Sequence, residues 1–244
     1  MKRENRKINA ELAGFTFTLH FLFLSASVQA TPINLIQNGD FSLGNIGFSS
    51  QYSYSATDTT PAGSYTVSTD PNLTHSAAMS FGDHTTGSGN MLVANGTTVP
   101  GLYVWAQTIS VAADTDYTFS GWAASWGQYG NGIDTDPARL LFLADDIQFG
   151  GIFTVTQQNG IWTEFVYGFN SGSSTSITLK IVNENLAYAP NDFSLDDLSL
   201  TSPSVIPLPA TAPMMLTGLV ILGAMVRRRN RAPGQCAQQR QQDM

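Results

Sequence analysis

The sequence predicts an antiparallel β-sandwich over residues 31–204, between an apolar N-terminal segment and an apolar C-terminal run. Short runs of alternating apolar and polar residues recur through this body, and turns rich in Gly, Asn and Asp separate them. No stretch of the body keeps the 3.6-residue apolar period of a helix. Its length of about 170 residues suits one all-β domain. We call residues 31–204 the body.

Residues 1–30 are typical of a secretory signal peptide. A basic start precedes a mostly apolar stretch from Leu12 to Val28, and small residues at Val28 and Ala30 favour cleavage after Ala30. The basic residues are Lys2, Arg3, Arg6 and Lys7. The alternative is a retained N-terminal anchor, which His20 and several Ser and Thr residues disfavour. We expect an exported protein whose mature chain begins at Thr31.

The alternating runs of the body are the expected strands. They lie around Tyr65 and Val67 and over residues 103–111, 118–124, 140–143, 162–169, 176–182 and 193–200. Polar, Gly-containing loops are expected at 82–90, 127–137 and 184–192. Strands of this length between such turns favour an antiparallel sandwich over a parallel α/β sheet.

Charge is distributed unevenly along the chain. The whole chain has a formal charge of −7, but the body holds fifteen acidic residues against Arg139 and Lys180, a formal charge of −13. A body so acidic repels nucleic acid and anionic lipid, and suits neutral sugars, cations or solubility outside a cell. The single Cys236 follows the apolar run, so the body has no disulfide, thiol chemistry or Cys-metal site.

The C-terminal region predicts a short membrane-spanning helix. An uncharged run of 17 residues extends from Ala210 to Val226, and Arg227, Arg228 and Arg229 follow it. This length is at the lower limit for a span, and the arginines mark the cytoplasmic side of an inner membrane. Residues 230–244 would then be a cytoplasmic tail. The alternative is a buried C-terminal helix of a soluble domain, which would show polar residues at helical spacing.

The residues before this helix carry a family resemblance. Ile206-Pro207-Leu208-Pro209-Ala210, the apolar run and the arginine cluster follow one another in that order. Residues 205–229 resemble the PEP-CTERM class of bacterial sorting signals in its "VPLPA" form. The resemblance implies cleavage near the motif by an exosortase-type membrane protease. It also implies transient anchoring in the inner membrane, then a cell-surface or extracellular location that accompanies extracellular polysaccharide.

Both ends of the body carry a second resemblance. Asn38-Gly39-Asp40-Phe41-Ser42 opens it and Asp196-Asp197-Leu198-Ser199-Leu200 closes it. The pair resembles the galactose-binding-like jelly rolls, which include carbohydrate-binding modules. The resemblance implies adjacent first and last strands and a structural Ca²⁺ held by Asp40, Ser42, Asp196 and Asp197, since Ca²⁺ prefers oxygen ligands. Locally hydrogen-bonded turn aspartates are the alternative, and Ser42 stands where such sequences often have Glu.

Aromatic residues are the candidate sugar contacts, because the C–H faces of sugars stack on flat rings. Trp126 and Tyr129 lie beside glycines in a predicted loop, where aromatic rings are less easily buried. Trp105 is a further candidate, although Trp105 and Trp122 in strands also suit core anchors of a sandwich.

The sequence offers no recognisable catalytic machinery. The pairs Asp134/Asp136 and Asp145/Asp146 could serve a glycosidase only at a defined separation, and adjacent aspartates are typical of turns. No Gly-x-Ser-x-Gly elbow with a partner histidine is present. We therefore expect a non-enzymatic protein that binds extracellular polysaccharide. The alternatives are a purely structural matrix protein and a polysaccharide hydrolase.

Overall fold

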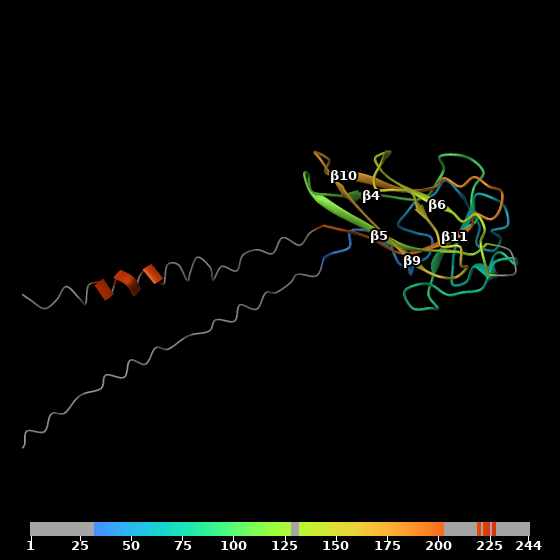
Figure 1. The fold of residues 1–244 in the computed structure, drawn as a ribbon, viewed down its shortest axis with the longest axis horizontal. Helices are drawn as coiled ribbons and strands as arrows, with labels where there is room; N and C mark the ends of the chain where they lie inside the picture. Colours follow the sequence, from blue (N-terminus) through green and yellow to red (C-terminus); the bar gives the residue numbers. More distant parts are fainter. Residues whose placement is uncertain (1–31, 128–131, 203–218, 221, 225, 228–244) are drawn as a thin grey trace, which may run out of the picture.

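The computed structural model describes residues 32–127, 132–202, 219–220, 222–224 and 226–227. Its strands form two sheets that face each other as the two layers of Figure 1. The six-stranded sheet has the order β1 (Ser53–Tyr54), β2 (Ser64–Ser68), β3 (Met91–Ala94), β11 (Phe193–Thr201), β5 (Asp116–Ser125) and β9 (Thr163–Asn170). The second sheet has the order β4 (Tyr103–Ser110), β10 (Ser176–Asn183), β6 (Arg139–Ala144) and β7 (Ile147–Gln148), with β8 (Phe153–Thr154) also paired to β6.

Strand pairing confirms the predicted antiparallel sandwich. All pairs of named strands are antiparallel in the described part of the chain, except β1 with β2. The expected runs form β2, β4, β5, β6, β9, β10 and β11. In β5, Tyr117 and Phe119 are buried whereas Thr118 is exposed, which is the alternation that predicted the strand.

Strand β3 escaped the sequence prediction. Met91, Leu92, Val93 and Ala94 are all fully buried, so the strand has no apolar–polar alternation to recognise. Leu92 and Ala94 belong to the main core, whereas Met91 and Val93 belong to a separate apolar cluster. Successive side chains point to opposite faces of a sheet. A second layer of side chains therefore covers the outer face of the six-stranded sheet at β3.

This second cluster joins β3 to the segment before it. Met91 and Val93 pack with Ala78 and Trp126, and Phe81 and Trp162 border the group. Segment 71–90, which begins with the short 3-10 helix η1 (Pro71–Leu73), supplies Ala78 and Phe81. It therefore covers part of the outer face of the six-stranded sheet.

Aromatic rings fill the space between the two sheets. Phe119 of β5 is fully buried, and its ring centroid lies 6.2 Å from Trp105, 5.8 Å from Phe142 and 5.6 Å from Phe165. These residues come from β4, β6 and β9, so a single ring links both sheets. The main core depends on this aromatic layer.

The two ends of the body lie side by side, as the jelly-roll resemblance implied. The Leu35 N–H donates to the Leu200 carbonyl at 2.9 Å, and the Leu198 N–H donates to the Gly39 carbonyl at 2.9 Å. The Asn34 side chain also accepts from the Leu200 N–H at 2.9 Å. In Figure 1 the chain enters and leaves the sandwich at the same end.

Several predictions concern residues outside the described part. The signal peptide (1–30), Tyr129, the tail (230–244) and the motif Ile206, Pro207, Leu208, Pro209, Ala210 lie there, as do Arg228 and Arg229. Arg227 is described and belongs to a helical piece. Among the described residues, no helix has the length and apolar character needed to cross a bilayer.

Candidate functional site

A bulge in β11 organises the outer face of the six-stranded sheet. Asp196 pairs with Trp122 of β5 and Ser199 pairs with Ser120, so β11 carries one extra residue between these pairs. Asp197 occupies it with φ of +49°, in the left-handed region that Asp tolerates better than most residues. Gly121 lies opposite, where an added Cβ would meet the Leu198 and Phe165 side chains.

The bulge carboxylates hold the loop at 82–90. Asp196 Oδ2 accepts from the backbone N–H of His84 at 2.9 Å and of Thr85 at 3.2 Å. Asp197 Oδ2 lies 2.6 Å from His84 Nδ1, and Asp197 Oδ1 accepts from the Thr85 hydroxyl at 2.7 Å. These hydrogen bonds join residues more than a hundred positions apart in sequence. We call the contacts of His84 and Thr85 with Asp196 and Asp197 the latch.

Within the loop, the buried Asp83 carboxylate is the common acceptor of several hydrogen bonds. It accepts from the Gly89 N–H at 2.7 Å, the Thr86 N–H at 3.0 Å and the Thr86 hydroxyl at 3.1 Å. Burial raises the pKa of Asp83, but these hydrogen bonds outweigh burial and bring its pKa below the ordinary value. The loop is thus shaped around a charged carboxylate.

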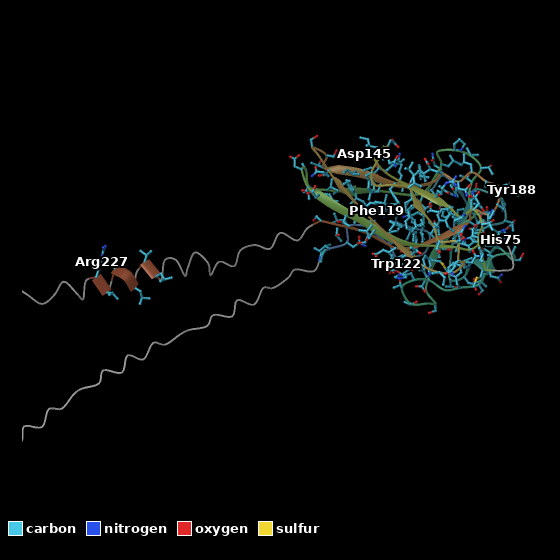
Figure 2. All side chains as sticks on the ribbon, viewed as in Figure 1. His75, Phe119, Trp122, Asp145, Tyr188 and Arg227 are labelled. Atoms are coloured by element: carbon cyan, nitrogen blue, oxygen red, sulfur yellow. The ribbon has the colours of Figure 1, made fainter. Side chains whose placement is uncertain are left out.

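Four rings form what we call the aromatic face: Phe81, His84, Trp122 and Trp162. His84 stacks on Trp122 with centroids 3.8 Å apart and an interplanar angle of 15°, and it meets Trp162 edge-on at 6.0 Å. Phe81 meets Trp162 at 5.8 Å. Figure 2 shows Trp122 on the side of the sandwich that faces away from the other layer, whereas Phe119 lies between the layers.

Polar groups surround these rings. Glu164 of β9 is the exposed cross-strand neighbour of Trp122, so both side chains lie on one face of the sheet. The side chains of His84 and Asp197 are each 29 % exposed. Trp162 is half-buried, and its Nε1–H donates to the Gly82 carbonyl at 3.1 Å. Partly exposed rings next to carboxylates can offer both stacking and hydrogen bonds to a ligand.

Asp196 is the electrostatically unusual member of the site. Burial raises its pKa to about 6; the Asp197 N–H lowers the pKa, and the charge of Asp197 raises it further. Asp196 is fully buried, and its Oδ1 has no hydrogen-bond partner among the described residues. The carboxyl group therefore holds a proton to a higher pH than an exposed aspartic acid does.

The structure corrects the predicted aromatic contacts. Trp126 is fully buried in the second cluster, with its ring 5.3 Å from His75, because segment 71–90 covers it. The expectation of an exposed Trp126 is wrong, and neither it nor the fully buried Trp105 can stack on a ligand in this conformation. Trp122, expected as a core anchor, is half-buried on the outer face.

The residues predicted to bind calcium make local contacts. Asp40 Oδ1 accepts from the Ser42 hydroxyl at 2.9 Å, whereas Asp196 and Asp197 contact His84 and Thr85. Among the described residues, no group of three or more His, Cys, Asp or Glu is arranged to hold a metal ion. Calcium binding by Asp40, Ser42, Asp196 and Asp197 therefore stays a prediction.

The other acidic pairs occupy a turn and a buried loop. Asp145 and Asp146 connect β6 to β7 with φ of +49° and +67°, the geometry of a two-residue hairpin turn. Asp146 binds Lys180 at 2.5 Å. Asp134 is buried, and burial raises its pKa; it accepts from the Ser125 hydroxyl and the Asp136 N–H. Asp145 accepts from the Thr178 N–H at 2.8 Å, and Asp136 lies 3.6 Å from Arg139, so each of these carboxylates has a partner within the fold.

Two hollows lie away from the aromatic face. One, of about 310 Å³, is lined largely by aliphatic side chains such as Leu141, Leu143 and Val182. The other, of about 250 Å³, lies at a loop-bearing end and includes His75, Asn95 and Tyr188. Figure 2 places His75 and Tyr188 together at that end. Neither hollow combines several rings with carboxylates.

Sequence reasoning missed His84, Thr85, Trp162 and Glu164 as site residues. One signal was available for Trp122: it alternates with Tyr117, Phe119 and Gly121, so it shares a strand face with polar Ser120. No sequence signal brings the 82–90 loop to this face, because its partners at the bulge are about 110 residues away.

No protein-family model matches the chain, and no curated protein matches it. Many solved structures are similar to it, among them the following three. The C-terminal domain of the sugar-binding protein EclA is 18 % identical over 41 % of this chain and 66 % of that domain, with a TM-score of 0.35. The CBM22-1 xylan-binding domain of Paenibacillus barcinonensis Xyn10C is 12 % identical over 67 % and 91 %, with a TM-score of 0.44.

The third structure is the Stig cyclase Fisc from Fischerella sp. TAU, 12 % identical over 71 % of this chain and 98 % of that enzyme, with a TM-score of 0.49. Sugar-binding domains and an enzyme thus occur together among these similar structures. Similarity at this level does not identify a ligand, so the ligand has to be inferred from the residues of the aromatic face.

Proposed function

We propose that this protein binds a neutral polysaccharide without catalysing its cleavage. One observation carries the proposal: Trp122 and Trp162 both contact His84 on the outer face of the six-stranded sheet, beside Asp197 and Glu164. Flat rings accept the C–H faces of sugars, and carboxylates accept hydrogen bonds from sugar hydroxyls.

The latch would keep this face preformed for a ligand. His84 is fixed on Trp122 by its backbone bond to Asp196 and its ring contact with Asp197. Trp162 is fixed by its Nε1–H bond to the Gly82 carbonyl. Rings already held in place lose little conformational entropy on binding, which favours affinity.

Charge limits the class of ligand. The body carries a formal charge of −13, and its two basic residues, Arg139 and Lys180, contact acidic residues elsewhere. Such a surface repels polyanions at low salt. Neutral glycans are therefore the favoured ligands, and uronic-acid polymers are disfavoured.

The Trp162→Ala variant tests the proposed face. We expect its affinity for a neutral matrix polysaccharide to fall at least tenfold, because buried aromatic anchors commonly contribute about 2 kcal/mol or more to binding. Affinity electrophoresis of the exported protein measures the change. Tyr188→Ala is the matched control, since it removes an exposed ring at a different end. Thermal unfolding identifies any loss of folded protein.

Other outcomes of this experiment would contradict the proposal. A wild-type protein that binds no neutral polysaccharide favours a purely structural matrix protein. Loss of binding in Tyr188→Ala but not in Trp162→Ala moves the site to the hollow beside His75. Release of reducing ends from the bound polysaccharide identifies a hydrolase instead.

We also propose that the chain is exported and sorted through its C-terminal motif, on the sequence resemblance alone. Because Pro207 and Pro209 disfavour helix, we expect an extended segment here, which is the form that a protease binds along its backbone. We expect a mature form that begins at Thr31 and ends near Ala210 when an exosortase-type protease is present. Mass spectrometry measures both ends. A tail that remains attached whether or not that protease is present contradicts the sorting proposal.

A further inference from the structure

The two sheets differ in how their edges are protected. β1 and β7, at one edge of each sheet, have two residues each and offer little backbone for pairing. β4 has eight residues, but the chain at Ser49 covers it through two hydrogen bonds with Ala106, of 2.8 and 2.9 Å. β9 also has eight residues, and in the described part of the chain it pairs only with β5. It is thus a long open edge.

The sequence of β9 also lacks the usual edge protection. In natural proteins, edge strands are protected from pairing with other chains by proline, by lysine, by a bulge or by being short. Thr163–Asn170 has none of these: its register with β5 is regular and its only charge is Glu164. Val166, near its centre, is 54 % exposed.

Nearby residues cover the inward side chains of β9. Phe149 lies 4.9 Å from Phe169, and Phe153 lies 5.7 Å from Phe165, measured between ring centroids. No described residue forms a backbone hydrogen bond with the outer edge of this strand. The inward side chains of β9 are therefore covered, whereas its outward peptide groups have no backbone partner among the described residues.

We infer that β9 pairs antiparallel with β9 of a second copy of this chain, about a two-fold axis near Val166. The two six-stranded sheets then become one continuous sheet with an isologous interface. In this register Val166 opposes Val166, and Glu164 opposes Gly168. The two Glu164 residues are then about 13 Å apart along the strands, beyond the Debye length at physiological salt. The edge is therefore complementary to itself despite the acidic body.

One consequence rests on the proposed sugar binding. Trp122 and Glu164 lie on the outer face, and a continuous sheet keeps the outer faces of both copies on the same side. The dimer thus presents two aromatic faces to one polysaccharide chain. Two linked sites raise the apparent affinity for a long chain without changing the affinity of each site.

Sedimentation of the full chain over a wide range of concentrations tests the pairing. The wild-type protein is expected to dimerise, and Val166→Lys to raise the dimer dissociation constant roughly tenfold or more, because two lysines then oppose each other in the sheet. Ile147→Lys is the matched control, since Ile147 is 73 % exposed on the short edge strand β7. This control is expected to dimerise like the wild type.

Hydrogen exchange gives a local reading that does not depend on any variant. Amides of residues 163–170 are expected to exchange more slowly as the wild-type concentration rises. A wild-type protein that stays monomeric overturns the inference. So does a Val166→Lys variant that associates as tightly as Ile147→Lys, which is the result expected if the apolar C-terminal run drives association. A failure of the proposed sugar binding can be told apart from a failure of the pairing, because it leaves the sedimentation and exchange results unchanged.

Discussion

Phe119→Ala is expected to lower the free energy of unfolding by about 3–5 kcal/mol, the usual cost of removing a large buried ring. The loss should be large because this ring contacts Trp105, Phe142 and Phe165 and thereby links the two sheets. Urea unfolding measures the change. In a domain of this size each kcal/mol corresponds to roughly 2–4 °C in the melting temperature.

Leu73→Ala is the control for this variant. Leu73 is 68 % exposed, so its truncation should change stability by less than about 0.5 kcal/mol. A Phe119→Ala variant that loses less than about 1 kcal/mol would mean that the aromatic layer is looser than the structure shows. The same result would contradict the view that one ring links the sheets.

The second large effect concerns pH and Asp196. Its pKa is raised to about 6 in the folded state, whereas an exposed aspartic acid titrates near 4. The folded protein therefore keeps a proton that the unfolded chain has already released. Linkage then requires that stability from this group is full below about pH 4 and is lost as pH rises through about 6.

Asp196→Asn should remove this pH dependence. The wild type is expected to gain at most about 2 kcal/mol relative to the variant between pH 7.5 and pH 4.5, because each unit of pKa difference contributes about 1.4 kcal/mol. Urea unfolding at several pH values measures the difference. Asp114→Asn, at an exposed residue with positive φ, controls for the change in net charge. Parallel pH profiles for wild type and Asp196→Asn would show that Asp196 does not titrate in this range.

Strands with one covered face were predictable from sequence. In β5 and β10 the alternation of apolar and polar residues gave strand ends within two residues of those observed. β3 was not predictable in this way, because segment 71–90 covers its outer face and removes the alternation. The same cover misled the prediction for Trp126: the glycine after it suggested an exposed loop, but Ala78 and Met91 bury the ring.

The candidate site was predictable only in part. The sequence singled out Asp196 and Asp197 only as calcium ligands together with Asp40 and Ser42. The structure places the two carboxylates against His84 and Thr85. The bulge explains the difference. One extra residue in β11 places both carboxylates within reach of the 82–90 loop, and such a register shift has no local sequence signature.

By itself the sequence determined the class of fold, the acidic and cysteine-free body, and the positions of its main strands along the chain, because each depends on composition or on a two-residue period. The tertiary structure alone decided which tryptophans face outward, which carboxylates meet the 82–90 loop, and that β9 is a long open edge. These depend on contacts between residues far apart in the chain. Local patterns record how a residue faces its own strand, not what the rest of the chain places over it.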